Sequence, residues 1–160
     1  MATGRAPLSA AFALLAALGC GEEARVSYAF LQEPGFEVDL LTLEFSDGSL
    51  TRRLSGDDFG GEGSRVDTPE FATRTSGELR TSFWLVAGAD TLAAGEQRIE
   101  LRPDFRWELT FRRSSSDPTV TCFGCFGRAA FALAPSLRAS PADSLWIVWG
   151  GNYISNPVVY

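Results

Sequence analysis

Arg106-Trp-Glu-Leu-Thr-Phe-Arg112 lies near the end of the segment 78–113, the stretch of sequence that decides the fold. Apolar and polar residues alternate strictly in it: Trp107, Leu109 and Phe111 fall on one face, and Arg106, Glu108, Thr110 and Arg112 fall on the other. A period of two residues is typical of a β-strand with one buried face. Upstream, Ile99 and Leu101 repeat this pattern. Two strands that bury the same kind of face need a second sheet to cover it.

The same signals recur along the rest of the chain. The clearest hairpin joins residues 41–45 to residues 50–54 through Asp47-Gly48, a strong short-range turn signal. Residues 55–68 are rich in glycine and acidic residues and are predicted to form a loop. After the N-terminal segment, roughly seven to nine short strands follow, and no helical period exceeds about two turns.

This pattern predicts an all-β fold. We expect an antiparallel β-sandwich of immunoglobulin-like or transthyretin-like type, built as a single domain from residues 26–160. A lipocalin-like β-barrel is the alternative, because alternating strands look alike in an open sandwich and a closed barrel.

Composition limits the possible functions. The 160-residue chain carries a net charge of −6, with 14 basic residues, all of them arginine. An acidic protein is not expected to bind nucleic acid, which requires clustered positive charge. The chain has no histidine, so the commonest general base, the usual catalytic triads and most zinc sites are excluded. We expect no metal and no cofactor.

The N-terminus has the features of a targeting segment. A lone Arg5 precedes an apolar run of about 11 residues from Leu8 to Leu18, which suits a cleaved signal helix and is too short to span a bilayer. The segment resembles a bacterial lipoprotein signal peptide, with the box Ala17-Leu18-Gly19-Cys20. This resemblance implies a signal peptide over residues 1–19, a lipid on Cys20 that anchors the exported protein to a membrane of the cell envelope, and a tether over residues 20–25.

Two details of this segment refine the expectation. Gly21, which follows Cys20, resembles the pattern of lipoproteins sent on to an outer membrane. Ala17-Leu18-Gly19 also fits the small-x-small pattern of ordinary signal cleavage, and this remains an alternative.

The chain has three cysteines. If Cys20 carries a lipid, Cys122 and Cys125 are left to pair, so we predict a structural disulfide between them. Their Cys-x-x-Cys spacing also suits thiol redox chemistry, which requires a following helix whose N-terminus lowers the thiol pKa; residues 128–134 are the candidate for that helix. Two thiolates alone are too few for a closed zinc site.

Two aromatic residues are candidates for a ligand surface. Trp84 is out of phase with Phe83 and Leu85, so it is expected to point away from the core, and Tyr153 follows the turn-forming Gly150-Gly151-Asn152. Exposed aromatic rings suit a sugar or an apolar ligand. The competing interpretation is that both pack against the second sheet.

These observations favour a lipid-anchored, non-catalytic binding or structural module of the cell envelope. Its expected partners are the membrane, through the lipid, and another envelope protein or a glycan. The alternatives are an envelope thiol-disulfide oxidoreductase, with Cys122 as nucleophile and Cys125 as resolving thiol, and a lipocalin-like carrier of apolar ligands.

Overall fold

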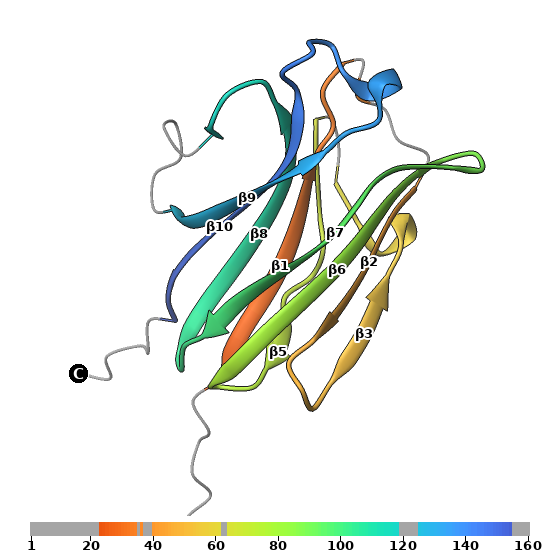
Figure 1. Ribbon diagram of the computed structural model, residues 1–160. Helices are drawn as coiled ribbons and strands as arrows, with labels where there is room; N and C mark the ends of the chain where they lie inside the picture. The colour runs from red at the N-terminus through yellow and green to blue at the C-terminus, as the bar shows by residue number, and fades with distance from the viewer. Residues whose placement is uncertain (1–22, 35, 37–39, 62–63, 119–124, 155–160) are drawn as a thin grey trace, which may run out of the picture.

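A computed structural model describes residues 23–34, 36, 40–61, 64–118 and 125–154 of the chain. The predicted signal peptide, Cys20 and Cys122 lie outside the described residues. Two β-sheets form the domain and stack face to face as two layers (Figure 1).

The larger sheet has six strands. Its order is β4-β1-β8-β10-β9, and β5 pairs with β1 beside β4. Neighbouring strands are antiparallel except β1 and β8, which run parallel, with Val26 opposite Trp107 and Phe30 opposite Phe111. The bounds are β1 (Ala24–Leu31), β4 (Arg65–Asp67), β5 (Phe71–Thr73), β8 (Phe105–Ser114), β9 (Cys125–Ala132) and β10 (Ser144–Tyr153).

The smaller sheet has four strands in the order β3-β2-β6-β7, all antiparallel. Short 3₁₀ turns lie in the connections that the structure describes. The bounds are β2 (Leu40–Ser46), β3 (Thr51–Leu54), β6 (Gly77–Ala87), β7 (Asp90–Leu101), η1 (Gly56–Asp58) and η3 (Pro135–Leu137).

The prediction of a β-sandwich is confirmed. Each described strand pairs only within its own sheet, so the two sheets stay open and the alternative of a closed lipocalin-like barrel is wrong. Alternation reports which face of a strand is buried but not which strands pair. An immunoglobulin-type sandwich keeps its first two strands in one sheet. Here β1 and β2 lie in different sheets, so the strand order departs from the immunoglobulin-type arrangement.

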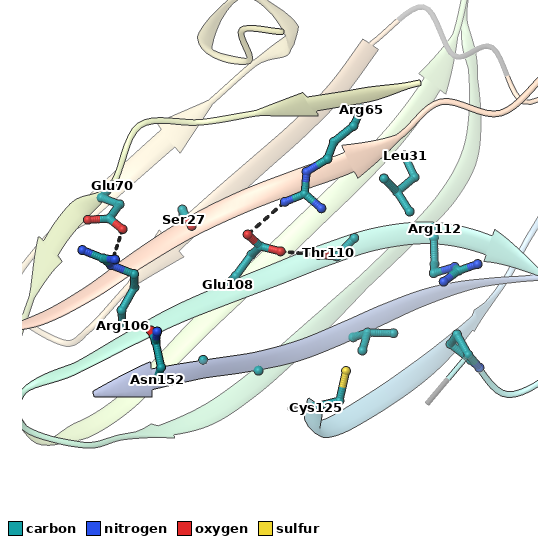
Figure 2. A pocket seen from close by; sticks show the side chains of 14 residues that line it. Ser27, Leu31, Arg65, Glu70, Arg106, Glu108, Thr110, Arg112, Cys125 and Asn152 are labelled. Atoms are coloured by element: carbon teal, nitrogen blue, oxygen red, sulfur yellow. Dashed lines mark hydrogen bonds and ion pairs between the residues drawn. The ribbon is translucent and has the colours of Figure 1, made fainter. Parts of the chain in front are cut away.

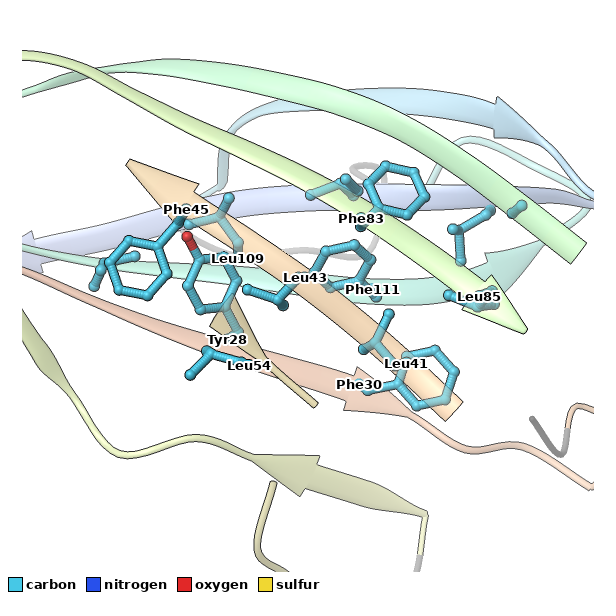
Figure 3. Close-up of a cluster of buried hydrophobic side chains, with 14 of the residues drawn as sticks. Tyr28, Phe30, Leu41, Leu43, Phe45, Leu54, Phe83, Leu85, Leu109 and Phe111 are labelled. Atoms are coloured by element: carbon cyan, nitrogen blue, oxygen red, sulfur yellow. The ribbon is translucent and has the colours of Figure 1, made fainter. Parts of the chain in front are cut away.

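The core lies between the sheets and is rich in aromatic residues (Figure 3). Phe83 of β6 contacts Phe111 of β8 edge to face, with ring centroids 5.3 Å apart. Tyr28 of β1 is fully buried, and its hydroxyl makes a 2.8 Å hydrogen bond with the Thr81 hydroxyl of β6. This bond joins the two sheets and satisfies both hydroxyl groups inside the core. Burial raises the pKa of Tyr28 well above its ordinary value, so the phenol stays neutral.

The predicted Asp-Gly hairpin joins β2 to β3. Asp47 is buried, and its Oδ1 accepts hydrogen bonds from the backbone N–H groups of Ser49 and Leu50, each at 2.8 Å. Its Oδ2 accepts a third bond from the N–H of Arg74, also at 2.8 Å. Gly48 has a φ of +84°, a conformation that favours glycine. The carboxylate therefore fixes the turn and ties it to the segment that follows β5.

Two sequence expectations differ from the structure. Residues 55–68 were expected to form a loop, but they contain η1 and the three-residue strand β4, which is too short to show alternation in the sequence. Residues 128–134, the candidate helix of the redox hypothesis, begin within β9. Pairing of β9 with β10, from Cys125 opposite Gly150 to Ala132 opposite Ser144, fixes this segment as a strand.

Candidate functional site

The outer face of the six-stranded sheet, the face turned away from the core, carries an open hollow of about 760 Å³. Strands β1, β8 and β10 form its floor (Figure 2). The polar alternation predicted for residues 106–112 places four of the lining side chains here. The lining residues are Ser27, Leu31, Arg65, Glu70, Arg106, Glu108, Thr110, Arg112, Pro118, Cys125, Val148, Gly150, Gly151 and Asn152.

Two of the three arginines in this hollow are neutralised by glutamates. Arg65 of β4 reaches across β1 to Glu108 of β8, with 2.9 Å between Nη2 and Oε2. Thr110 donates a hydrogen bond to the same carboxylate at 3.1 Å. Burial acts to lower the pKa of Arg65, but its bonds to Glu108 and Asp67 outweigh burial, and the pKa is raised. This ion pair, like the Arg106–Glu70 pair described next, is about half exposed, so each adds at most about 1 kcal/mol to stability.

The second ion pair lies at the other end of the hollow. Arg106 of β8 donates from Nε to Glu70, which comes just before β5 and also lies 3.7 Å from Arg25 (Figure 2). Gly151 faces this end, where an added Cβ would overlap the carbonyl oxygen of Arg106. A side chain at position 151 would therefore push β10 away from β8.

Arg112, the third arginine, has no acidic partner among the described residues. Its Nε is buried without a hydrogen-bond acceptor. A buried donor with no partner costs about 1–3 kcal/mol, and more when the group is charged. Unsatisfied groups are rare in folded proteins and call for an explanation. Contacts within the described structure therefore do not explain why the Arg112 Nε is buried here.

The surroundings of Arg112 are less polar than the rest of the hollow. Trp146 of β10 is its cross-strand partner, and the indole Nε1 donates to the Ser114 carbonyl at 3.2 Å. Leu31 lies at the same end of the hollow, away from the Glu70–Arg106 pair (Figure 2). Val148 is 6% exposed and also lines it. An ionic contact made here is weakened less by solvent than one at an open surface.

The two aromatic residues predicted as a ligand surface lie in different sheets. Trp84 is on the outer face of β6 in the four-stranded sheet and is 38% exposed. Tyr153 ends β10 in the six-stranded sheet, is 68% exposed and contacts Phe105 edge to face, with ring centroids 5.2 Å apart. Neither residue lines the hollow.

Sequence reasoning missed an aromatic cluster around Tyr153. Phe126 is 51% exposed and contacts Phe105 and Trp107, while the guanidinium of Arg102 lies 5.2 Å from the Phe126 ring. A bulge between Trp149 and Gly150 explains the miss. Beyond it, Cys125 pairs with Gly150 and Gly127 pairs with Trp149, so the intervening Phe126 has no register position that alternation could predict.

The cysteines are only partly placed. Cys125 begins β9 and its Sγ faces the hollow (Figure 2). Cys122 and Cys20 lie outside the described residues, so their pairing and lipidation stay predictions.

No helix in the described part of the chain has the length and apolar character needed to cross a bilayer. Within the same residues, no three acidic or cysteine side chains are close enough together to hold a metal ion. The sequence matches no protein-family model and no curated protein.

Proposed function

We propose that this protein is a lipid-anchored, non-catalytic binding module of the cell envelope, with the hollow over β1, β8 and β10 as its binding surface. The lipoprotein-like box ending in Cys20 supports the anchor. The two-sheet sandwich supports a role in presenting a binding surface on one sheet. The partner is another envelope protein or a glycan.

Arg112 is the observation that carries this proposal. Its guanidinium lies in a hollow whose other arginines are already paired, and its Nε has no acceptor. A partner that supplies an acceptor removes the cost of that unpaired donor when it binds. A buried polar group without a partner is rare enough to call for a specific explanation.

A structural disulfide between Cys122 and Cys125 belongs to the same proposal. Cys125 opens a strand, where no helix N-terminus stabilises a thiolate. The bond closes a very short loop, so it adds only about 2 kcal/mol to stability. Its main effect is to hold the beginning of β9 at the border of the hollow.

The anchor and the disulfide are tested together by the intact mass of the detergent-extracted protein, measured with thiol alkylation before and after reduction. We expect acyl chains on Cys20, and alkylation of Cys122 and Cys125 only after reduction. An unlipidated chain whose two cysteines react without reductant would contradict both parts.

The binding surface is tested by cross-linking in intact cells. A photo-reactive residue replaces Asn152, which is exposed and lines the hollow. In a matched control it replaces Trp84, on the outer face of the other sheet. We expect a discrete cross-linked product from position 152 and none from position 84. The reverse result would move the binding surface to the four-stranded sheet.

A further inference from the structure

We propose that the group recognised in this hollow is a single carboxylate, held by the guanidinium of Arg112 and carried on an apolar or aromatic body. This inference rests on the proposed function, because it takes the hollow as the binding surface. It adds the chemical class of the ligand and the residue that selects it.

The charge of the hollow sets the charge of the ligand. Its lining contains the arginines Arg65, Arg106 and Arg112 and the glutamates Glu70 and Glu108, which leaves one positive charge. The glutamates are engaged with Arg65 and Arg106, so the uncompensated charge resides on Arg112. A monoanion neutralises this site. A phosphate dianion would bring an excess negative charge close to the carboxylate of Glu108, with a repulsive contribution.

The donor geometry of arginine favours a carboxylate. A guanidinium presents Nε–H and a terminal N–H side by side, and the pair matches the two oxygens of a carboxylate. The Nε of Arg112 is covered and has no acceptor. Rotation of this long side chain toward the hollow exposes its Nε–H, and little is lost because the Nε has no acceptor in the covered position.

The neighbours of Arg112 define the rest of the ligand. Trp146 is its cross-strand partner, and Leu31 and Val148 line the same hollow. An apolar body next to the carboxylate covers these side chains and excludes water, which strengthens the charged contact. Charged groups would instead meet the Glu70–Arg106 ion pair at the opposite end.

The experiment is a titration of the full chain in detergent micelles, labelled with ¹⁵N only in arginine. The chain has 14 arginines, so the Nε–Hε spectrum is simple enough to assign by substitution. Three probes of similar shape are compared: benzoate, neutral benzamide and phenyl phosphate. We expect benzoate to shift the Arg112 signal in a saturable way, benzamide to leave it unchanged and phenyl phosphate to bind several-fold more weakly.

Two variants test whether benzoate binds at Arg112. R112Q keeps a hydrogen-bonding side chain without the charge and should weaken benzoate binding about tenfold or more. R80Q makes the same change on the outer face of the four-stranded sheet, at an arginine paired with Glu96, and should bind benzoate as the wild type does. Equal binding of benzoate and benzamide, tighter binding of phenyl phosphate, or wild-type affinity in R112Q would each overturn the inference.

The outcomes separate this inference from the proposed function. If position 152 cross-links to an envelope partner but R112Q binds benzoate normally, the surface stands and the carboxylate assignment fails. If benzoate binding depends on Arg112 but Cys20 carries no lipid, the carboxylate site stands and the anchored function fails.

Discussion

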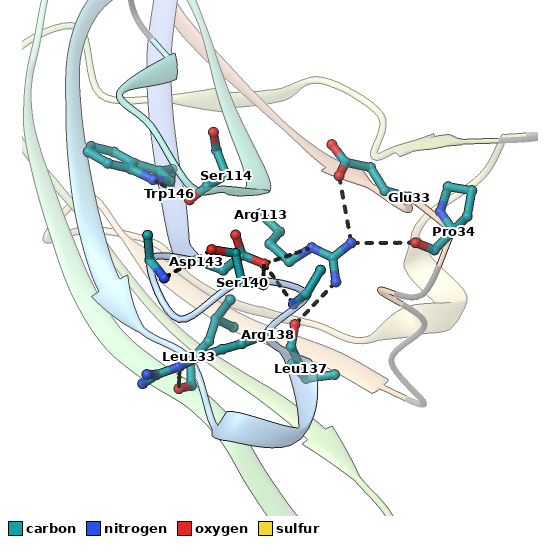
Figure 4. Close-up of polar contacts among 12 residues, drawn as sticks. Glu33, Pro34, Arg113, Ser114, Leu133, Leu137, Arg138, Ser140, Asp143 and Trp146 are labelled. Carbon is teal, nitrogen blue, oxygen red and sulfur yellow. Dashed lines mark hydrogen bonds and ion pairs between the residues drawn. The ribbon is translucent and has the colours of Figure 1, made fainter.

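Two consecutive arginines of β8, Arg112 and Arg113, lie in opposite environments. Arg113 is 8% exposed on the core side of the sheet, where Nη1 donates to the Leu137 carbonyl at 3.2 Å (Figure 4). Its Nε is 3.8 Å from the buried carboxylate of Asp143, and its guanidinium lies 5.0 Å from the centre of the Phe36 ring. Arg112, one residue earlier on the opposite face, has none of these partners.

The difference follows from the strand itself. Successive side chains point to opposite faces, so neighbours with the same chemistry meet different surroundings. Arg113 connects β8 to the segment around Leu137 and to the loop that follows β1, through the Pro34 carbonyl at 3.4 Å. Arg113 therefore contributes to the fold, whereas the N–H donors of Arg112 are those that we propose bind the ligand.

The comparison is tested first by replacing the buried arginine. R113M retains much of the side-chain volume but leaves Asp143 as a buried charge without its cation and the Leu137 carbonyl without its donor. We expect the free energy of unfolding to fall by about 3–5 kcal/mol. Urea denaturation followed by tryptophan fluorescence measures it. The matched control is R112M, and an equal loss in both variants would show that the two sites do not differ.

Asp47 is a buried carboxylate whose hydrogen bonds are satisfied. Its contribution to the free energy of unfolding should therefore depend on pH. Burial acts to raise the pKa of Asp47, but hydrogen bonds from Leu50, Ser49 and Arg74 lower it more, to about 2. This pKa lies below the unfolded value near 3.8. The carboxylate therefore stabilises the fold by about 2 kcal/mol above pH ~4, and this contribution is lost as the pH falls through ~2.

The D47N variant isolates this contribution. It should be less stable than the wild type at neutral pH, and the gap should close as the pH falls from ~4 to ~2. Urea midpoints measured across that range give the difference directly. A gap that stays constant with pH would mean that the charge of Asp47 is not what stabilises the turn.

Much of the fold was predictable because alternation is a local signal. The inward row Trp107, Leu109 and Phe111 and the Asp47-Gly48 hairpin were predicted from the sequence and are confirmed. Pairing is not local. The parallel contact between β1 and β8 joins segments about 80 residues apart in the chain, and no residue pattern in either strand encodes the partner.

The candidate site was predictable only in part. The sequence places Arg106, Glu108 and Arg112 on one face of a strand. It does not show that Arg65 and Glu70, from the segment before β6, cross the sheet edge to neutralise two of these groups. The unpaired state of Arg112 depends on those contacts, so it emerges only from the three-dimensional arrangement.

A milder change sharpens the contrast within the hollow. E108Q removes one of the two carboxylates that pair with Arg65, so the hollow loses one negative charge while Arg65 stays paired with Asp67. The pair is half exposed, so the free energy of unfolding should change by less than about 1 kcal/mol. Benzoate should bind E108Q several-fold more tightly than the wild type in the arginine Nε–Hε titration. Weaker binding would show that Glu108 supports the site rather than limits its charge.

The smallest effect on stability is expected at Arg112 itself. R112M removes a charged side chain that has no ion pair, together with a buried Nε that has no acceptor. Loss of an unsatisfied buried donor is neutral or stabilising, so the urea midpoint should stay level or rise slightly, equivalent to at most about 1 kcal/mol. Benzoate binding should be lost in the same protein. A clear fall in stability would mean that Arg112 supports the fold as Arg113 does. If R112M keeps its stability but loses benzoate binding, then Arg113 stabilises the fold and Arg112, its neighbour of identical chemistry, recognises the ligand.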